Sequence, residues 1–325
     1  MDLDLAVDGP SESAWHNALG SLRPFRWPDC GRLVVVAPHP DDETLGAGGL
    51  IATAALRSTP VVIVSVTDGE LAYDAANLAA TRRAELDAAV AVLSQHSGLV
   101  SVVRLHLPDG RLHECVDEIT HHLTALLRHD DLVVAPLADD GHSDHEVCAL
   151  ASRSASIAKS SCFCSYPVWA WHCHEPETSS TRSGERLDLS PEAARRKHAA
   201  TLCFSSQTDG PTPVVPARML VRLRRSYEVY VPSGPAVEVW SAFCTITTGE
   251  RDCVRVQVSG FSPLAVSACS ISVDLSPPTA APPGVSSGEA SGGRAGSLPR
   301  RSAIASITAP SLADAIGPSP TTRVP

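Results

Sequence analysis

The sequence predicts an α/β protein, a Rossmann-like three-layer sandwich in which helices cover both faces of a mostly parallel sheet. Five short apolar runs alternate with longer segments in which apolar residues recur at three-to-four spacing, the pattern of strands joined by helices. The runs are continuously apolar, as expected of strands buried on both faces. In such a fold ligands bind beyond the carboxyl ends of the strands, so the residues that follow each strand are candidate site residues.

The predicted elements alternate along the first half of the chain. The strands are residues 33–37, 61–66, 100–107, 132–135 and 162–169. The helices between them are residues 43–56, 78–93, 115–127 and 146–158. Gly46, Gly48 and Gly49 lie in the first of these helices, and close packing on the sheet explains them better than a dinucleotide-binding loop, whose spacing they lack.

The rest of the chain divides into a helix, short strands and a tail. A helix is predicted over residues 191–204, with Ser190 as its N-cap and Pro191 at its first position. Residues 227–231, 237–243 and 251–257 have strand patterns, and we expect short late strands outside the main sheet. Residues 276–299 are rich in Pro, Gly, Ser and Ala, a composition that buries too little apolar surface to fold. We therefore predict an N-terminal extension (1–30), a main domain (31–270) and a disordered tail (271–325).

Composition favours small molecules as partners. The formal net charge of −10 and the pI of about 5.7 argue against the clustered basic surface that nucleic acid or an anionic membrane requires. No apolar run approaches the roughly 18 residues of a membrane span, and acidic residues stand where a signal peptide has basic ones. We expect a cytoplasmic, soluble protein whose ten Cys are reduced thiols. The oligomeric state is not predicted.

Four ionisable groups in five residues follow the first predicted strand, within PHPDDE at residues 38–43. In a loop after a strand, His39 and Asp42 can bind one metal ion while Asp41 faces the water bound to that ion. The alternative is that Asp41 and Asp42 only cap the next helix, because acidic side chains stabilise a helix N-terminus. Capping needs one of them and has no use for His39, but spacing alone leaves both interpretations open.

A second cluster, DDGHSDHE at residues 139–146, follows the fourth predicted strand and so lies at the same edge of the sheet. With His145, the pair His39 and Asp42 forms a set of two imidazoles and one carboxylate, which suits a catalytic zinc ion with an open position. The same set binds ferrous iron, so the metal is either Zn²⁺ or Fe²⁺. The alternative is a helix start with Asp144 as its cap and with exposed imidazoles at His142 and His145.

Together, PHPDDE and GHSDH (residues 141–145) resemble the signature of the PIG-L/LmbE family of zinc-dependent de-N-acetylases. Other motifs agree with the resemblance: TDGE at residues 67–70, Arg82-x-x-Glu85, PDG at residues 108–110 and the segment 197–207. The resemblance covers roughly residues 31 to 235 and implies that residues 31–270 form a de-N-acetylase domain. Phe204 departs from the pattern, because many members have His before the Ser-Gln pair; the departure puts a late contact in doubt but not the metal site.

The resemblance implies roles for the two clusters. His39, Asp42 and His145 match the family's metal ligands, and Asp41 matches the general base that acts on the bound water, whose pKa the ion lowers. The implied cofactor is Zn²⁺, with Fe²⁺ as the alternative.

Four further residues receive roles in the same way. His142 matches the residue that stabilises the tetrahedral oxyanion or protonates the leaving amine. Asp144 beside it would fix the orientation of that imidazole and favour its charged form. Arg82 and Asp109 match positions that bind substrate hydroxyls. Without the resemblance, a surface ion pair and a turn residue would be the simpler interpretation of Arg82 and Asp109.

The implied activity is hydrolysis of an N-acetyl, or another N-acyl, group from an amino sugar in a small-molecule conjugate such as a thiol-cofactor precursor or an antibiotic. Two other interpretations stay open: an iron-dependent oxygenase with the same ligands, and a non-catalytic protein that binds a sugar conjugate. Asp41, His142 and Asp144 argue against simple binding, which needs no general base.

Two smaller groups have structural alternatives. Cys162, Cys164 and Cys173 lie near two histidines, but the one-residue spacing of the first pair differs from a zinc knuckle, so buried or idle thiols are favoured. Trp169 and Trp171 alternate at the end of the fifth predicted strand. They would either stack on a sugar ring or pack in the core, and packing is favoured.

Overall fold

The computed structural model describes residues 9–20, 22–95, 97–211 and 213–232, and the backbone of three further strands, β9 (Phe243–Thr248), β10 (Val254–Ser259) and β11 (Cys269–Val273). These three strands form a sheet of their own in the order β11-β10-β9. Most of the predicted strand at residues 237–243, and the predicted tail from residue 274 onward, lie outside the described residues.

The main sheet has eight strands in the order β1-β7-β8-β6-β5-β2-β3-β4. The strands are β1 (Arg23–Pro24), β2 (Arg32–Ala37), β3 (Val61–Thr67), β4 (Val100–Leu107), β5 (Asp131–Pro136), β6 (Cys162–Tyr166), β7 (Glu185–Asp188) and β8 (Tyr227–Pro232). The five strands from β6 to β4 pair in parallel, as predicted. Their carboxyl ends therefore lie at one edge of the sheet.

Two predictions about strands were wrong. Residues 227–231 were expected outside the main sheet, but β8 lies within it and pairs antiparallel with both β6 and β7. A strand pattern shows which residues are buried, not which sheet edge accepts the strand. The predicted strand at residues 162–169 ends at Tyr166, because Pro167 cannot donate a ladder hydrogen bond and the short helix α6 follows.

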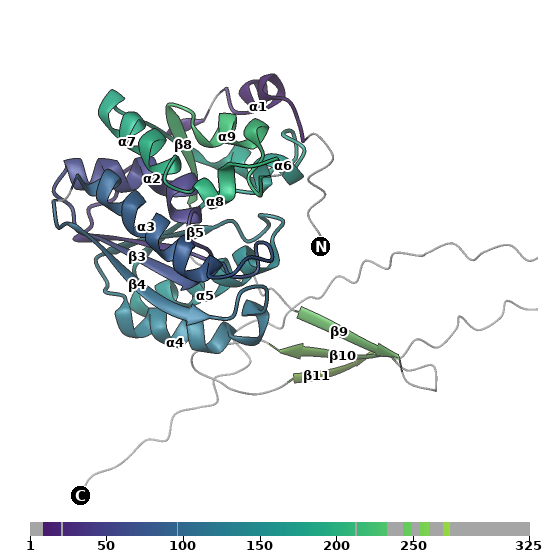
Figure 1. Cartoon of the computed structure of the whole chain (residues 1–325). Helices are drawn as coiled ribbons and strands as arrows, with labels where there is room; N and C mark the ends of the chain where they lie inside the picture. Colours follow the sequence, from purple (N-terminus) through teal and green to yellow (C-terminus); the bar gives the residue numbers. More distant parts are fainter. Residues whose placement is uncertain are drawn as a thin grey trace, which may run out of the picture. The chain divides into compact units, whose positions relative to one another are not determined.

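The helices cover both faces of the sheet (Figure 1). The long ones are α2 (Asp42–Leu56), α3 (Leu78–Ser94), α4 (Val116–Leu126), α5 (Ser143–Lys159) and α7 (Pro191–Thr201). The short ones are α1 (Glu12–Ala18), α6 (Ala170–Cys173), α8 (Ser205–Thr208) and α9 (Ala217–Leu223), with the 3₁₀ turns η1 (Leu112–Glu114) and η2 (Ser180–Ser183). In the described part of the chain, no helix is long and apolar enough to cross a membrane.

Alternate residues of β2 enter two separate cores. Leu33 and Val35 belong to the core under α2, α3 and α7, whereas Val34 and Val36 belong to the core under α4 and α5. All four side chains are fully buried. This explains why the strand reads as a continuous apolar run and confirms the three-layer α/β fold.

The segment before residue 31 contributes to the core. Trp15 of α1 is fully buried, and its ring meets that of Trp171 edge to face at 4.8 Å between centroids. Its indole Nε1 donates a hydrogen bond to the carbonyl of Trp171 at 3.0 Å. Trp171 is thus a packing residue, and the residues assigned to an N-terminal extension pack with the main sheet in the described range.

A buried carboxylate joins α2, α7 and β8. Glu228 accepts hydrogen bonds from Lys197 Nζ at 2.6 Å, from the backbone N–H groups of Gly49 and Leu50 at 2.7 and 2.8 Å, and from Tyr230 Oη at 2.7 Å. Both oxygens of this carboxylate are therefore paired, which a buried charge requires. The late lysine of the segment 197–207 is thus structural.

Gly46 lies where α2 approaches β6. A Cβ atom at this position would overlap the ring of Tyr166, which is itself fixed because its hydroxyl donates to the carbonyl of Val36 at 2.7 Å. We expect Gly46→Ala to lower the free energy of unfolding by about 1–3 kcal/mol through overpacking, measured by urea denaturation. Gly48→Ala is the matched control in the same helix. The nearest atom that its methyl would meet is the side-chain Cγ of Lys197, at 3.1 Å, without the overlap found at Gly46, so equal losses for the two variants would contradict this explanation.

Candidate metal centre

Three side chains from two loops converge at the carboxyl edge of the sheet. His39 follows β2, Asp42 begins α2, and His145 lies in the first turn of α5, after β5. Asp42 Oδ2 lies 3.1 Å from His39 Nδ1 and 3.2 Å from His145 Nε2. The candidate ligand atoms of the three residues lie within 4.8 Å of one another, and all three residues are buried. The structure thus brings together the three residues that the sequence analysis grouped.

The donor set fits a metal ion. His145 Nε2 is buried and has no hydrogen-bond partner, while its Nδ1 pairs with Asp140 Oδ2 at 2.8 Å. A neutral imidazole that donates through Nδ1 has its lone pair on Nε2, the atom that faces Asp42. Two imidazole nitrogens and one carboxylate oxygen are a donor set for zinc or ferrous iron.

Each histidine of the set is oriented by a second carboxylate on its other nitrogen. Asp109 Oδ1 lies 3.0 Å from His39 Nε2, and Asp140 Oδ2 holds His145. Asp140 is itself fixed by the backbone N–H groups of residues 168, 169 and 170, at 2.9, 2.9 and 3.1 Å. Such carboxylate–histidine pairs orient metal ligands and raise their basicity. The sequence analysis gave Asp140 no role, because DDGHSDHE contains three aspartates and spacing does not distinguish them.

The electrostatic field of the cluster favours a cation. Burial opposes the charged form of His39, but its contacts with Asp109, Asp144 and Asp42 outweigh burial and raise the pKa well above the usual value. In His145 burial is likewise outweighed by Asp42 and Asp140, so that the pKa rises to about 9. Burial alone would raise the pKa of Asp42, yet His145 and His39 hold it well below its usual range. A positive charge is therefore stable beside Asp42.

Asp41 has an unusual backbone conformation. Its φ of 134° and ψ of −32° lie in a region that L-residues rarely adopt. Its N–H donates to Glu43 Oε2 at 3.1 Å, and its Oδ2 lies 3.2 Å from Arg82 Nη2. Its side chain makes no capping hydrogen bond with α2, so capping does not explain the residue. Strain of this kind is usual where a functional group must be held in place.

Burial also affects the two carboxyl groups beside the candidate ligands. It raises the pKa of Asp41 to about 7 and that of Glu43 to about 8. In Asp41 the guanidinium of Arg82 opposes the shift. A cation in the centre would oppose it further, because a nearby positive charge favours the carboxylate.

His142 caps α5 and faces the centre. Its Nδ1 accepts a hydrogen bond from the backbone N–H of Asp144 at 3.3 Å, and its ring lies 5.0 and 4.9 Å from those of His39 and His145. The ring of Trp169 stacks on it at 6.5 Å between centroids. Burial and the imidazoles of His145 and His39 lower the pKa of His142 to about 4. The carboxylate of Asp144 favours the charged form of His142, as expected, but burial and the two neighbouring imidazoles outweigh this effect.

We expected the carboxylate of Asp144 to orient His142, but its hydrogen bonds are with the loop after β4. Its Oδ2 accepts from the N–H of Gly110 at 2.8 Å and lies 3.5 Å from His39 Nε2, and its Oδ1 accepts from the N–H of Leu112 at 3.3 Å. It therefore holds the loop after β4 against the centre. Only its backbone N–H contacts His142.

The two predicted substrate contacts are buried. Arg82 is 3 % exposed and Asp109 is 7 % exposed. Asp109 Oδ2 accepts from the N–H of Leu71 at 2.8 Å, so both of its oxygens have protein partners. Leu71 itself is 66 % exposed.

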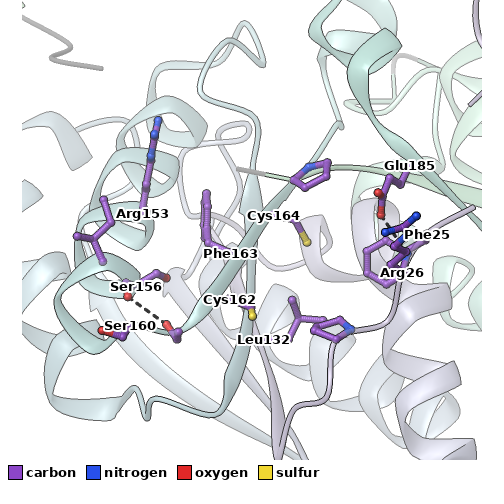
Figure 2. A pocket seen from close by; sticks show the side chains of 14 residues that line it. Phe25, Arg26, Leu132, Arg153, Ser156, Ser160, Cys162, Phe163, Cys164 and Glu185 are labelled. Carbon is purple, nitrogen blue, oxygen red and sulfur yellow. Dashed lines mark hydrogen bonds between the residues drawn. The ribbon is translucent and has the colours of Figure 1, made fainter. Parts of the chain in front are cut away.

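A separate cavity of about 470 Å³ lies at the opposite edge of the sheet, among the first residues of β5 and β6 and the end of α5 (Figure 2). Among the described residues that line it, Glu185 supplies the one carboxylate, whose Oε2 accepts from the N–H of Arg26 at 3.0 Å. Cys162 and Cys164 belong to the same lining, which includes no described histidine. Across the described part of the chain, the groups able to hold a metal lie at the centre described above and do not include these cysteines.

Part of this chain is similar to known proteins. Residues 34–156, which include the three candidate ligands and Asp41, match the sequence profile of the family described as GlcNAc-PI de-N-acetylase, or PIG-L. This part of the chain is therefore similar to the PIG-L family. A curated relative, the 1D-myo-inositol 2-acetamido-2-deoxy-alpha-D-glucopyranoside deacetylase of Rhodococcus erythropolis, is 29 % identical over 143 residues. That alignment covers 35 % of this chain and 49 % of the relative, so the chain spans about half the length of the curated relative it matches.

Two solved structures illustrate the similarity. A triple mutant of a deacetylase involved in the teicoplanin biosynthetic pathway is 19 % identical, with a TM-score of 0.52 over 64 % of this chain and 99 % of that one. A conserved protein from Thermus thermophilus is 26 % identical, with a TM-score of 0.48 over 64 % of this chain and 96 % of that one. At 19 % identity, the first likeness supports the α/β fold of this chain and nothing finer.

The strain at Asp41 can be measured as stability. Asp41→Gly should unfold at a higher urea concentration than Asp41→Ala, by on the order of 1 kcal/mol, because only glycine adopts this φ without strain. At Asp87, which is exposed within α3, the order should reverse, because glycine destabilises a helix interior by about 0.5–1 kcal/mol relative to alanine. If the alanine variant were the more stable one at both positions, Asp41 would be unstrained.

Proposed function

We propose that the protein is a zinc-dependent de-N-acetylase that hydrolyses an N-acetyl, or another N-acyl, group of an amino sugar in a small-molecule conjugate. The observation that carries the proposal is the convergence of His39, Asp42 and His145 with Asp41 beside them. The match of residues 34–156 to the PIG-L family supports the reaction type, and the curated relative's name supports an acetamido sugar as the group attacked. Examples of such a conjugate are a thiol-cofactor precursor and an antibiotic.

The ligand set would hold the ion and leave a position for water and the acyl oxygen. When bound, the ion lowers the pKa of water and polarises the acyl oxygen. Asp41 would take the proton of the attacking water, because it directly precedes the ligand Asp42 and is held within the cluster. The water oxygen would bond to the acyl carbon, the C–N bond would break, and the proton on Asp41 would pass to the leaving nitrogen. The acid product keeps the second proton of the water, and that proton then passes from the acid to the amine, which gives acetate and an ammonium group.

His142 would stabilise the oxyanion as a neutral donor. Because its Nδ1 accepts from the N–H of Asp144, the hydrogen bond assigns the ring proton to Nε2. A neutral Nε2–H can donate to the charge that develops on the acyl oxygen. Between the two roles that the resemblance implies, this geometry supports oxyanion stabilisation over protonation of the amine.

Removing the base and removing a ligand should have different effects. Asp41→Asn should keep stoichiometric zinc while turnover falls about a hundred- to ten-thousandfold, the contribution of a positioned general base. His145→Ala should lose the zinc, and Asp42→Asn should bind it weakly enough that excess zinc restores part of the activity. Zinc is measured by elemental analysis, and turnover by release of free amine from N-acetylglucosamine and from 1D-myo-inositol 2-acetamido-2-deoxy-alpha-D-glucopyranoside.

The matched control is His121→Ala, which removes an exposed histidine of α4 and should leave both zinc and turnover unchanged. Full turnover by Asp41→Asn with zinc bound would refute the proposed mechanism. Activity that required oxygen and ferrous iron would favour the oxygenase, and zinc-independent sugar binding without amine release would favour the non-catalytic protein.

A further inference from the structure

Arg82 lies on α3 with its guanidinium turned into the loops around the centre. Its Nη1 donates to the carbonyl of Gly69 at 3.0 Å, and its Nη2 donates to the carbonyl of Pro40 at 2.7 Å. The same Nη2 lies 3.2 Å from Asp41 Oδ2. Its Nε is buried and has no hydrogen-bond partner among the described residues. Both Nη atoms of Arg82 are therefore directed at protein groups, and its side chain is only 4 % exposed.

The surrounding loop is shaped to admit this guanidinium. Gly69 has a φ of +65°, and a Cβ atom at this position would overlap the guanidinium of Arg82. The N–H of Gly69 donates to Thr67 Oγ1 at 3.1 Å, and that hydroxyl donates to the carbonyl of Pro38 at 2.9 Å. The motif at residues 67–70 thus fixes both the start of the PHPDDE loop and the carbonyl that receives Arg82.

Asp41 is held at two points. Glu43 accepts its backbone N–H and supports the unusual φ, but this contact leaves the carboxylate free to rotate about its side-chain torsions. The guanidinium of Arg82 bridges Oδ2 of Asp41 and the carbonyl of the preceding residue, Pro40. A planar donor group that spans side chain and backbone fixes that rotation.

We propose that Arg82 is a positioning residue that holds the carboxylate of Asp41 toward the attacking water, and not a contact for substrate hydroxyls. The inference rests on the proposed function, because it gives Arg82 its role through the general base. The family resemblance implies that Arg82 binds substrate hydroxyls. Its burial and its three acceptors support the positioning role instead.

A double-mutant cycle with Asp41 tests the proposal. Arg82→Gln should lower kcat about 10–100-fold, the usual effect of a residue that orients a catalytic group, while KM stays within about twofold and zinc stays bound. In the Asp41→Asn background, Arg82→Gln should cause no further loss of kcat, because the group it positions is gone. The substrate is 1D-myo-inositol 2-acetamido-2-deoxy-alpha-D-glucopyranoside, or N-acetylglucosamine if only that compound is turned over.

Two further variants serve as a control and as a substitute for Arg82→Gln. Arg83→Gln is the matched control, because the neighbouring Arg83 is half-exposed and pairs with Asp68; its kcat and KM should be unchanged. Gly69→Ala displaces the guanidinium without removing it, and should show the same fall in kcat at constant KM if Arg82→Gln does not fold.

The outcomes separate this inference from the proposed function. A rise in KM of about tenfold or more at unchanged kcat, in both backgrounds, would identify Arg82 as a substrate contact and overturn the inference alone. Full activity of Asp41→Asn would overturn the proposed function and the inference with it.

Discussion

The carboxylate of Asp42 lies between two imidazoles that belong to different crossovers of the sheet. One of its oxygens faces His39 on the loop after β2 and His145 at the start of α5, and it also accepts the N–H of His39 at 3.0 Å. A buried carboxylate is stable only when positive charge or hydrogen-bond donors surround it. The two loops therefore stay together because both contribute to pairing this one group, and a metal ion shared by the three side chains would satisfy the same need.

Around this pairing the protein places a second layer of carboxylates and one strained residue. Asp109 and Asp140 hold the outer nitrogens of the two histidines, and Asp144 holds the loop after β4 against them. Asp41 keeps an unfavourable backbone conformation at the centre of this layer. Burying several acidic groups and one strained residue lowers stability, and the two apolar cores supply the compensation.

Sequence periodicity predicted the central parallel strands and brought the two polar clusters together. The alternation of apolar runs and helical segments predicts parallel strands, and parallel order brings the ends of β2 and β5 to one edge. Spacing left the metal and capping interpretations open, and the family resemblance implied His39, Asp42 and His145 as the ligands. The strands β1 and β7 were missed because they are two and four residues long and carry charged residues. The position of β8 in the main sheet was missed because the residues of a strand do not show which other strands it pairs with.

The orienting residues could not be found in the same way. Asp140 depends on three backbone N–H groups of residues 168–170, and Arg82 depends on carbonyls of two other loops. Both sets of partners are distant in sequence, so spacing carries no signal for them. The partners of the late segment 197–207 are also distant in sequence. Lys197 pairs with Glu228, and Ser205 and Ser206 donate hydrogen bonds to Glu85. This segment therefore holds helices together.

Zinc K-edge X-ray absorption of the protein loaded with one equivalent of zinc would show whether two imidazoles and the carboxylate between them bind the ion. If His39, Asp42 and His145 are the ligands, the absorption spectrum should show nitrogen and oxygen neighbours at about 2.0–2.2 Å, with outer scattering from two imidazole rings. The chain also has ten cysteines, which could bind zinc instead. Sulfur scattering at about 2.3 Å, or the absence of stoichiometric zinc, would rule out this ligand set.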